Sequence, residues 1–198
     1  MPTITKTTSD TASLIISAEV PQSLKDTIAF FGTLDTAYKH LRTLELFVAD
    51  LEDGQESAIQ LFPTYERDAT ILAERYLLPE DGLFLVRAKF ESEGFWGFLG
   101  PLNPLLQIRM YLQDRHERKK DIDYRNKLER RRLELEIGSL WADNLEKLVN
   151  VLKLAGFTKP QIRQILIEHY HKPLAALGEA ADKAGVTDIS VESLPDAT

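Results

Sequence analysis

The basic side chains between residues 115 and 132 are the strongest chemical signal in this 198-residue sequence. This segment holds nine basic and four acidic residues, so it carries a formal charge of +5, and the rest of a chain of net charge −7 carries −12. Clustered lysine and arginine side chains bind phosphate groups or acidic protein surfaces. The candidate contact residues in this segment are Arg115, Arg118, Lys119, Arg130, Arg131 and Arg132.

The same charges also fit a solvent-exposed helix that needs no partner. Asp114–Arg118, Asp121–Arg125 and Asp123–Lys127 each place an acid four residues before a base. That order stabilises an isolated helix by about 0.2–0.5 kcal/mol per pair. An acidic chain is also a poor candidate for sequence-independent nucleic-acid binding. The exposed helix is therefore the favoured interpretation, and nucleic-acid binding is the alternative.

A second signal is the aromatic stretch that precedes this segment. Residues 94–108 carry no charge and include Phe95, Trp96 and Phe98 among several glycines and prolines. The glycines and prolines predict a turn or a broken helix. The favoured interpretation is a hinge whose aromatic rings pack under a sheet. An exposed patch for a partner protein is the second interpretation, and peripheral membrane contact is the weakest.

The histidines do not predict a metal site. His116-Glu117 lacks the second histidine of a helical zinc-protease motif, and His40 stands alone. His169 and His171 are two residues apart and therefore lie on different faces of a helix. The chain has no cysteine, which excludes disulfides, thiolate catalysis, cysteine-ligated zinc and iron–sulfur clusters. No metal ligands are predicted.

Local motifs of enzymes are also missing. The junctions PQSLKDT and PTYERDA hold no glycine cluster for a phosphate, and the sequence contains no Gly-x-Ser-x-Gly elbow. No catalytic residue, no cofactor and no small-molecule ligand can be identified. The sequence leans away from an enzyme.

The elements that position these residues divide into a mixed half and a helical half. Alternating strands and helices are expected at 13–20, 33–52, 57–62, 65–77 and 83–90, with some parallel pairing. In the last strand we expect Val86, Ala88 and Phe90 to be buried and Arg87 and Lys89 to be solvent-exposed. This order predicts a small three-stranded β-α-β-α-β lobe.

The second half is predicted to be helical from Pro104 onward. A helix over 104–153 would break near Asp121 or Gly138. Gly156 suits a helix end, and Thr158 with Gln161 makes a capping box for the next helix. Lys172-Pro173 predicts a break before a short helix that ends at Gly185. The pair of helices at 144–154 and 158–170 reads as an ordinary helical hairpin, with a DNA-binding helix-turn-helix as the alternative.

The expected fold class is therefore α+β or α/β: the small lobe, then a long charged helix, then a C-terminal helical hairpin. The expected domains are a disordered tail (1–12), a small α/β domain (13–100), a helical region (101–185) and a flexible tail (186–198). The segment MPTITKTTSDTAS lacks the apolar run of a signal peptide, and no segment reaches the ~20 apolar residues of a membrane span, so a soluble, cytoplasmic protein is expected.

The expected function is that of a non-enzymatic protein–protein interaction or assembly module that presents a charged helical arm. Sparse apolar residues on a long helix indicate that packing surface comes from elsewhere, and a second copy is the simplest source. The expected partners are thus the chain itself or another protein. The alternative is nucleic-acid binding through Arg115–Arg132, and the weaker alternative is membrane association through Phe95–Phe98.

Overall fold

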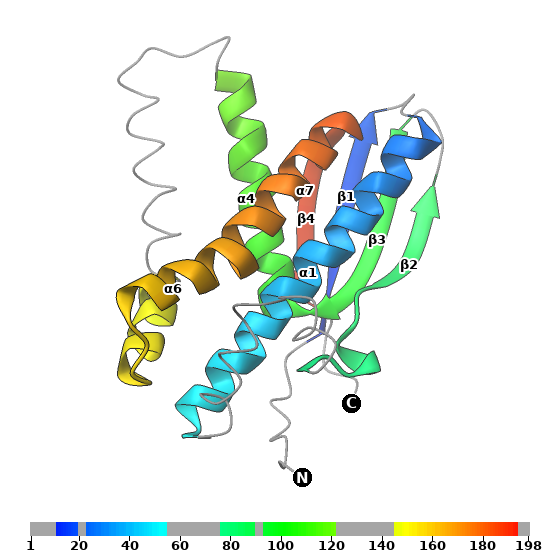
Figure 1. Ribbon diagram of the computed structural model, residues 1–198. Coiled ribbons are helices and arrows are strands. Elements are labelled where there is room, and N and C mark those ends of the chain that lie inside the picture. The colour runs from blue at the N-terminus through cyan, green and yellow to red at the C-terminus, as the bar shows by residue number, and fades with distance from the viewer. Residues whose placement is uncertain (1–10, 20–22, 55–75, 90–92, 122–144, 194–198) are drawn as a thin grey trace.

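The strands of the computed structural model, which describes residues 11–19, 23–54, 76–89, 93–121 and 145–193, form one antiparallel sheet (Figure 1). The strand order is β2-β3-β1-β4, and every neighbouring pair runs antiparallel. The strands are β1 (Thr11–Glu19), β2 (Phe84–Lys89), β3 (Glu93–Pro101) and β4 (Val186–Ser193). Strands from the beginning and the end of the described chain therefore pair with each other.

Three long helices cover one face of this sheet (Figure 1). They are α1 (Leu24–Glu52), α4 (Leu102–Asp121) and α7 (Lys172–Lys183). Their apolar side chains share one core with the sheet, because apolar residues recur at three- and four-residue steps along each helix. Fully or almost fully buried examples are Phe30, Leu34 and Leu41 of α1, Leu105, Ile108 and Leu112 of α4, and Leu174 and Leu177 of α7.

The opposite side of the sheet, called the open face below, is covered by none of the described helices. Successive residues of a strand point to opposite faces. In β1 the side chains of Leu14 and Ile16 are buried under the helices, whereas Ser13, Ile15 and Ser17 are only partly buried on the open face.

A second core lies at the C-terminal end of α1. There Leu44 and Phe47 pack with Leu152, Phe157 and Ile165 from a helical hairpin. The hairpin consists of helical residues 145–154, α6 (Lys159–Leu166) and the π-helical turn η2 (Ile167–His171). At 29 residues α1 is about 44 Å long, which lets one helix contribute to both cores.

Several predicted elements are present with altered boundaries. The strand at 13–20 is confirmed as β1, although Thr11 and Ala12, expected in the tail, already belong to it. The helix at 33–52 is confirmed as part of α1, but it begins at Leu24. Its N-cap is Ser23, whose hydroxyl oxygen accepts a hydrogen bond from the Asp26 backbone N–H at 3.1 Å. The capping box at Thr158 and the left-handed φ of +90° at Gly156 are confirmed.

The sheet topology corrects the expected fold. The class is confirmed as mixed helix and sheet, but the pairing is antiparallel where some parallel pairing was expected. The three-stranded β-α-β-α-β lobe is wrong, because β3 and β4 complete the sheet around β1. The strand expected at 57–62 and almost all of the helix expected at 65–77 lie outside the described residues. The boundary expected near residue 100 stays a prediction.

The aromatic stretch is not a turn or a broken helix, because residues 93–101 form the inner strand β3. Its glycines mark close approaches. A Cβ on Gly100 would lie 2.8 Å from the Tyr38 hydroxyl oxygen, and a Cβ on Gly97 would lie 3.4 Å from the Cβ of Arg87. Glycine in a strand often marks such a site, so the glycines here permit packing and do not break the strand.

Two further predictions about the C-terminal third are wrong. The chain does not break at Lys172-Pro173, because η2 widens the helix and joins α6 to α7. The Lys172 backbone N–H donates to the carbonyl of Ile167, five residues earlier, and this π-type bond accommodates the proline. Residues 186–193, expected in a loose tail, form β4 at the edge of the sheet. The tail expected at 194–198 lies outside the described residues.

Candidate interaction surfaces

Trp96 and Phe98 belong to the core and not to an exposed patch. Their side chains are 3% and 4% exposed. The ring of Phe31, on α1, meets both rings edge-on, with centroid distances of 5.1 Å to Trp96 and 5.4 Å to Phe98. Edge-to-face aromatic pairs of this kind add about 0.5–1.5 kcal/mol beyond the burial of their area. The two rings therefore attach α1 to the sheet.

Phe95 points to the open face and is only partly buried. The guanidinium carbon of Arg87, on the neighbouring strand β2, lies 5.4 Å from the centre of the Phe95 ring. A cation at this distance is attracted by the electrons of the ring face. Of the three aromatic residues predicted to form an interaction site, Phe95 is thus the one whose ring is available on a described surface.

The basic segment is described only at its beginning. Arg115 donates to Asp182 through Nε at 3.2 Å and Nη2 at 2.7 Å, an ion pair that ties α4 to α7. Arg118 and Lys119 lie in the last turns of α4, and their side-chain positions are not among the described features. Arg130, Arg131 and Arg132 lie outside the described residues. An interaction through this segment, with protein or nucleic acid, stays a prediction.

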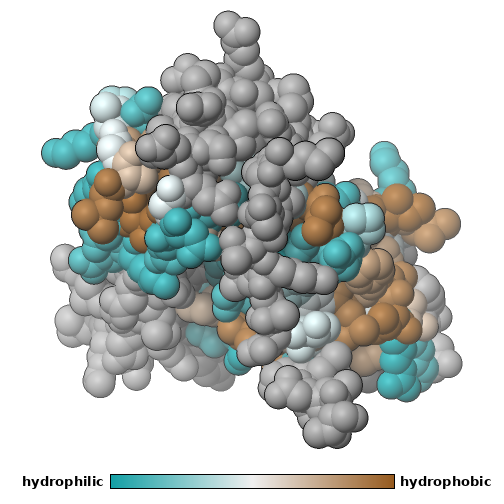
Figure 2. Space-filling view, turned by 90° about the horizontal axis from the view of Figure 1, so that it is seen from below, coloured by the Kyte–Doolittle hydropathy of each residue, from teal (hydrophilic) through white to brown (hydrophobic). Residues whose placement is uncertain are grey.

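The strand β2 is the least buried element of the sheet. All six of its residues are exposed, and Phe84, Leu85 and Val86 are 51%, 50% and 53% exposed. The expected burial of Val86 and Ala88 is therefore wrong, because β2 is an edge strand and lies beyond the helix layer. Apolar side chains show as brown areas on the right of Figure 2, the side on which β2 lies in Figure 1. Exposed apolar clusters of this kind mark interaction surfaces.

A bulge in β2 turns two adjacent side chains to the open face. The register shifts between Leu85 and Arg87, so that β2 has one extra residue at this point. A Cβ on Gly97 would contact both Arg87, at 3.4 Å, and Val86, at 3.8 Å. Val86 and Arg87 therefore lie on the same side of the sheet, next to Gly97.

The open face has opposite charges at its two edges. The pairing register defines a row across the sheet that runs from Lys89 through Phe95 and Ser17 to Asp188. The next row runs from Arg87 through Gly97 and Ile15 to Ser190, and the third ends at Glu192. Hence β2 carries the basic residues Arg87 and Lys89, and β4 carries the acidic residues Asp188 and Glu192. The central strands contribute the apolar residues Ile15, Phe95 and Leu99 together with Ser13 and Ser17. The acidic Glu19 of β1 lines the same hollow as Arg87, Lys89 and Phe95.

The free side of β4 is partly closed by α4. The Gln113 side-chain amide donates to the carbonyl oxygen of Ile189 at 3.3 Å, and Gln113 in turn accepts from Arg109 Nε at 3.2 Å. An edge strand whose backbone is covered in this way is protected from pairing with another strand. The bulge and the two basic residues protect the β2 edge by other means. Docking is therefore expected on the open face and not by addition of a strand.

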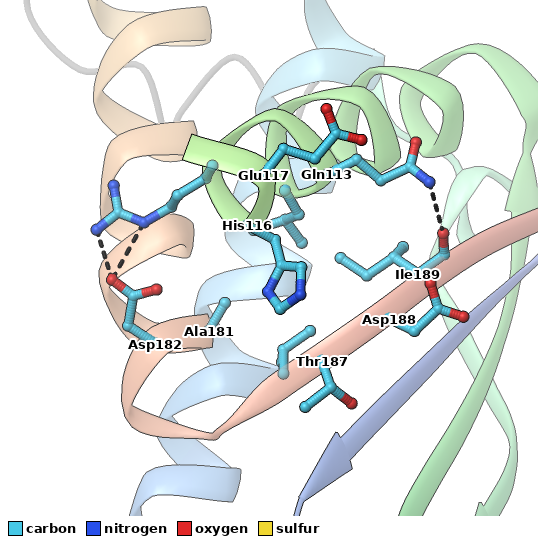
Figure 3. A pocket seen from close by; sticks show the side chains of 11 residues that line it. Gln113, His116, Glu117, Ala181, Asp182, Thr187, Asp188 and Ile189 are labelled. Atoms are coloured by element: carbon cyan, nitrogen blue, oxygen red, sulfur yellow. Dashed lines mark hydrogen bonds and ion pairs between the residues drawn. The ribbon is translucent and has the colours of Figure 1, made fainter. Parts of the chain in front are cut away.

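A small polar pocket lies between α4, α7 and β4 (Figure 3). Its volume is about 190 Å³, and the His116 ring points into it toward Thr187. Nε2 of His116 is buried, with no hydrogen-bond partner among the described residues. Within the described part of the chain, no three His, Asp or Glu side chains are grouped so that they could hold a metal ion. The pocket therefore offers one imidazole and no assembled coordination site.

The histidines that the sequence left apart meet in the core. His40 of α1 and His169 of η2 approach through their Nδ1 atoms at 3.3 Å. Burial lowers the pKa of both, and that of His169 falls to about 3. At neutral pH the pair is uncharged, with one Nδ1 as donor and the other as acceptor. In the sequence, the burial of His169 is indicated by helical spacing, because His169 continues the apolar stripe of Ile162 and Ile165.

Comparison with protein-family models, curated proteins and solved structures finds no match for this chain. Among the described helices, none combines the length and the apolar composition that a bilayer span requires.

Proposed function

We propose that this chain is a protein–protein interaction module whose first partner is a second copy of itself, docked open face to open face. The observation that carries the proposal is the order of side chains across the rows that run from β2 to β4: basic at β2, mainly apolar in the centre and acidic at β4. A surface that is complementary to itself is what a two-fold symmetric dimer requires.

The row of residues that runs from Lys89 through Phe95 and Ser17 to Asp188 fixes the direction of the two-fold axis in such a dimer. A two-fold axis parallel to the strands, between two stacked sheets, brings β2 of each copy over β4 of the other. Lys89 then faces Asp188 of the second copy, and Arg87 lies at the level between Asp188 and Glu192 of the second copy. Packed sheets are about 10 Å apart, a gap that a lysine and an aspartate from opposite sides can bridge.

The apolar centre supplies the favourable free energy of this contact. Ile15, Phe95 and Leu99 are partly exposed at the middle of the open face, and Phe84 and Val86 extend this surface along β2. Burying apolar area contributes about 25 cal/mol per Å², while charge pairs at a rim contribute mainly orientation and specificity. The edge charges therefore set the register of a contact that apolar burial stabilises.

The direct test is sedimentation velocity over a concentration series up to tens of micromolar. The expected result is a dimer for the unmodified chain and a shift toward monomer for Lys89→Glu, which places an acid against Asp188 of the second copy. Lys25→Glu, an equal change of charge on an exposed position of α1, is the matched control and should leave the dimer intact. A compact monomer at every concentration would contradict the proposal.

A further inference from the structure

The helical hairpin carries an apolar groove that is separate from the open face. The groove runs between helical residues 145–154 and the continuous helix of α6 and η2, and its volume is about 490 Å³. Its floor is formed by the side chains of Leu145, Val149, Ile162, Leu166, Ile167 and Tyr170. Apolar surface shows as brown on the left of Figure 2, the side on which α6 lies in Figure 1.

The rim of this groove is basic. Lys153 stands on one wall, and Lys159 and Arg163 stand on the other, one helical turn apart. All three are exposed, and none of the described residues that line the groove is acidic. A partner that fills this groove must be apolar where it meets the floor and acidic where it meets the rim.

The shape of the groove fits a helix. Two packed helices that diverge leave a channel between them, and such channels bind the apolar stripe of a third, amphipathic helix. The lining residues follow helical spacing: Leu145, Val149 and Lys153 are four residues apart on one helix, as are Lys159 and Arg163 on the other. A bound helix that lies along the channel would present acidic side chains to both walls at once.

We propose that the groove between residues 145–154 and 159–171 binds an acidic amphipathic helix of another protein. The apolar stripe of that helix lies on Val149, Ile162 and Leu166, and its flanking Asp and Glu side chains pair with Lys153, Lys159 and Arg163. Exposed ion pairs contribute little to affinity, so the charges select the partner and the apolar floor provides most of the affinity. The groove takes no part in the sheet, and this binding is therefore independent of self-association.

The test uses fluorescence anisotropy with the full chain and a labelled peptide of about 18 residues, which is about 27 Å long as a helix. The peptide has leucine at helical spacing i, i+3, i+4 and i+7 and glutamate on both flanks of that stripe. A second peptide is identical except that lysine replaces each glutamate. We expect the glutamate peptide to bind, the lysine peptide to bind at least tenfold more weakly, and added salt to weaken the first.

Rim variants locate the binding. Lys159→Glu combined with Arg163→Glu should weaken the glutamate peptide at least tenfold, and both positions are exposed, so the fold is preserved. Lys25→Glu should bind the peptide like the unmodified chain, and the rim variant should keep the sedimentation behaviour of the unmodified chain. Equal affinity for the two peptides would overturn the proposal. The proposal would also be overturned if the rim variant bound the glutamate peptide as tightly as the unmodified chain does. Binding to phosphatidylglycerol vesicles without binding to the peptide would overturn it as well.

Discussion

His40 and His169 meet through their Nδ1 atoms at 3.3 Å, and this contact joins α1 to the π-helical turn η2. His169 is fully buried, and burial together with the charge of His40 lowers its pKa to about 3. Burial also lowers the pKa of His40, while the nearby Glu168 carboxylate opposes that shift. The hairpin is thus attached to the rest of the molecule through a contact in which the buried His169 stays neutral.

The pair makes stability depend on pH in a defined direction. A histidine with a lowered pKa binds a proton in the unfolded state but not in the folded one, between pH 6.5 and about 3. Stability is therefore fully present above pH 6.5 and falls as the pH drops through this range. From pH 6.5 to pH 5, His169 alone should lower the free energy of unfolding by about 2 kcal/mol.

Urea denaturation at several pH values measures this effect, and substitutions assign it. His169→Leu should flatten the dependence between pH 6.5 and 5, whatever it does to absolute stability. His171→Gln, at the exposed neighbouring histidine, should leave the slope unchanged. A slope that His169→Leu leaves unchanged would show that other groups are responsible.

Substitution by alanine should change stability in opposite directions at Gly100 and Gly32. A Cβ on Gly100 would lie 2.8 Å from the Tyr38 hydroxyl oxygen in a filled core, so Gly100→Ala should cost about 1–3 kcal/mol. Gly32 lies within α1 with open space around it, so Gly32→Ala should stabilise by about 0.5–1 kcal/mol. Thermal unfolding of both variants checks the prediction; two shifts of the same sign would contradict it.

Two ion pairs of α1 should differ in their contribution to the free energy of unfolding, because they differ in burial. The side chain of Arg42 is 5% exposed and contacts Asp81 and Glu45, each at 2.7 Å, whereas Lys39–Asp35 is an exposed pair. Asp81→Ala leaves part of a buried guanidinium without its carboxylate partner and removes an acceptor of the Leu78 backbone N–H. It should therefore lower the free energy of unfolding by about 3 kcal/mol.

Asp35→Ala should cost at most about 0.5 kcal/mol, as exposed helical pairs do. Chemical denaturation of the two variants provides the comparison. Equal losses would mean that Arg42 is satisfied by Glu45 alone or is reached by solvent.

What could be predicted from the sequence was local. Thr158 with Gln161, Gly156 and the β-branched run of β1 each carry their signal within a few residues, and the structure contains all of them. The turn or broken helix expected for the aromatic stretch is wrong, because glycine also occurs in strands that other groups approach closely, here Tyr38 and Arg87. Only the fold shows which of these two uses applies.

The candidate surfaces could be predicted only in part. The alternation in β2 correctly indicated that Arg87 and Lys89 are solvent-exposed. The alternating apolar residues Val86 and Ala88 are exposed as well, because nothing in a local pattern identifies an edge strand. Asp188 and Glu192 could not be assigned a face, because β4 is short, polar and paired with residues about 170 positions earlier. Their relation to Lys89 exists only across the finished sheet.

The most direct test of the central claim is a charge exchange between Lys89 and Asp188. In one chain these residues lie on opposite edges of the sheet, three strand spacings or about 14 Å apart, so they cannot form an ion pair with each other. Sedimentation should show that Lys89→Glu and Asp188→Lys each dissociate the dimer and that the double variant restores it. If both single variants remain dimeric, or if the double variant stays monomeric, two copies do not dock through the open face in this register.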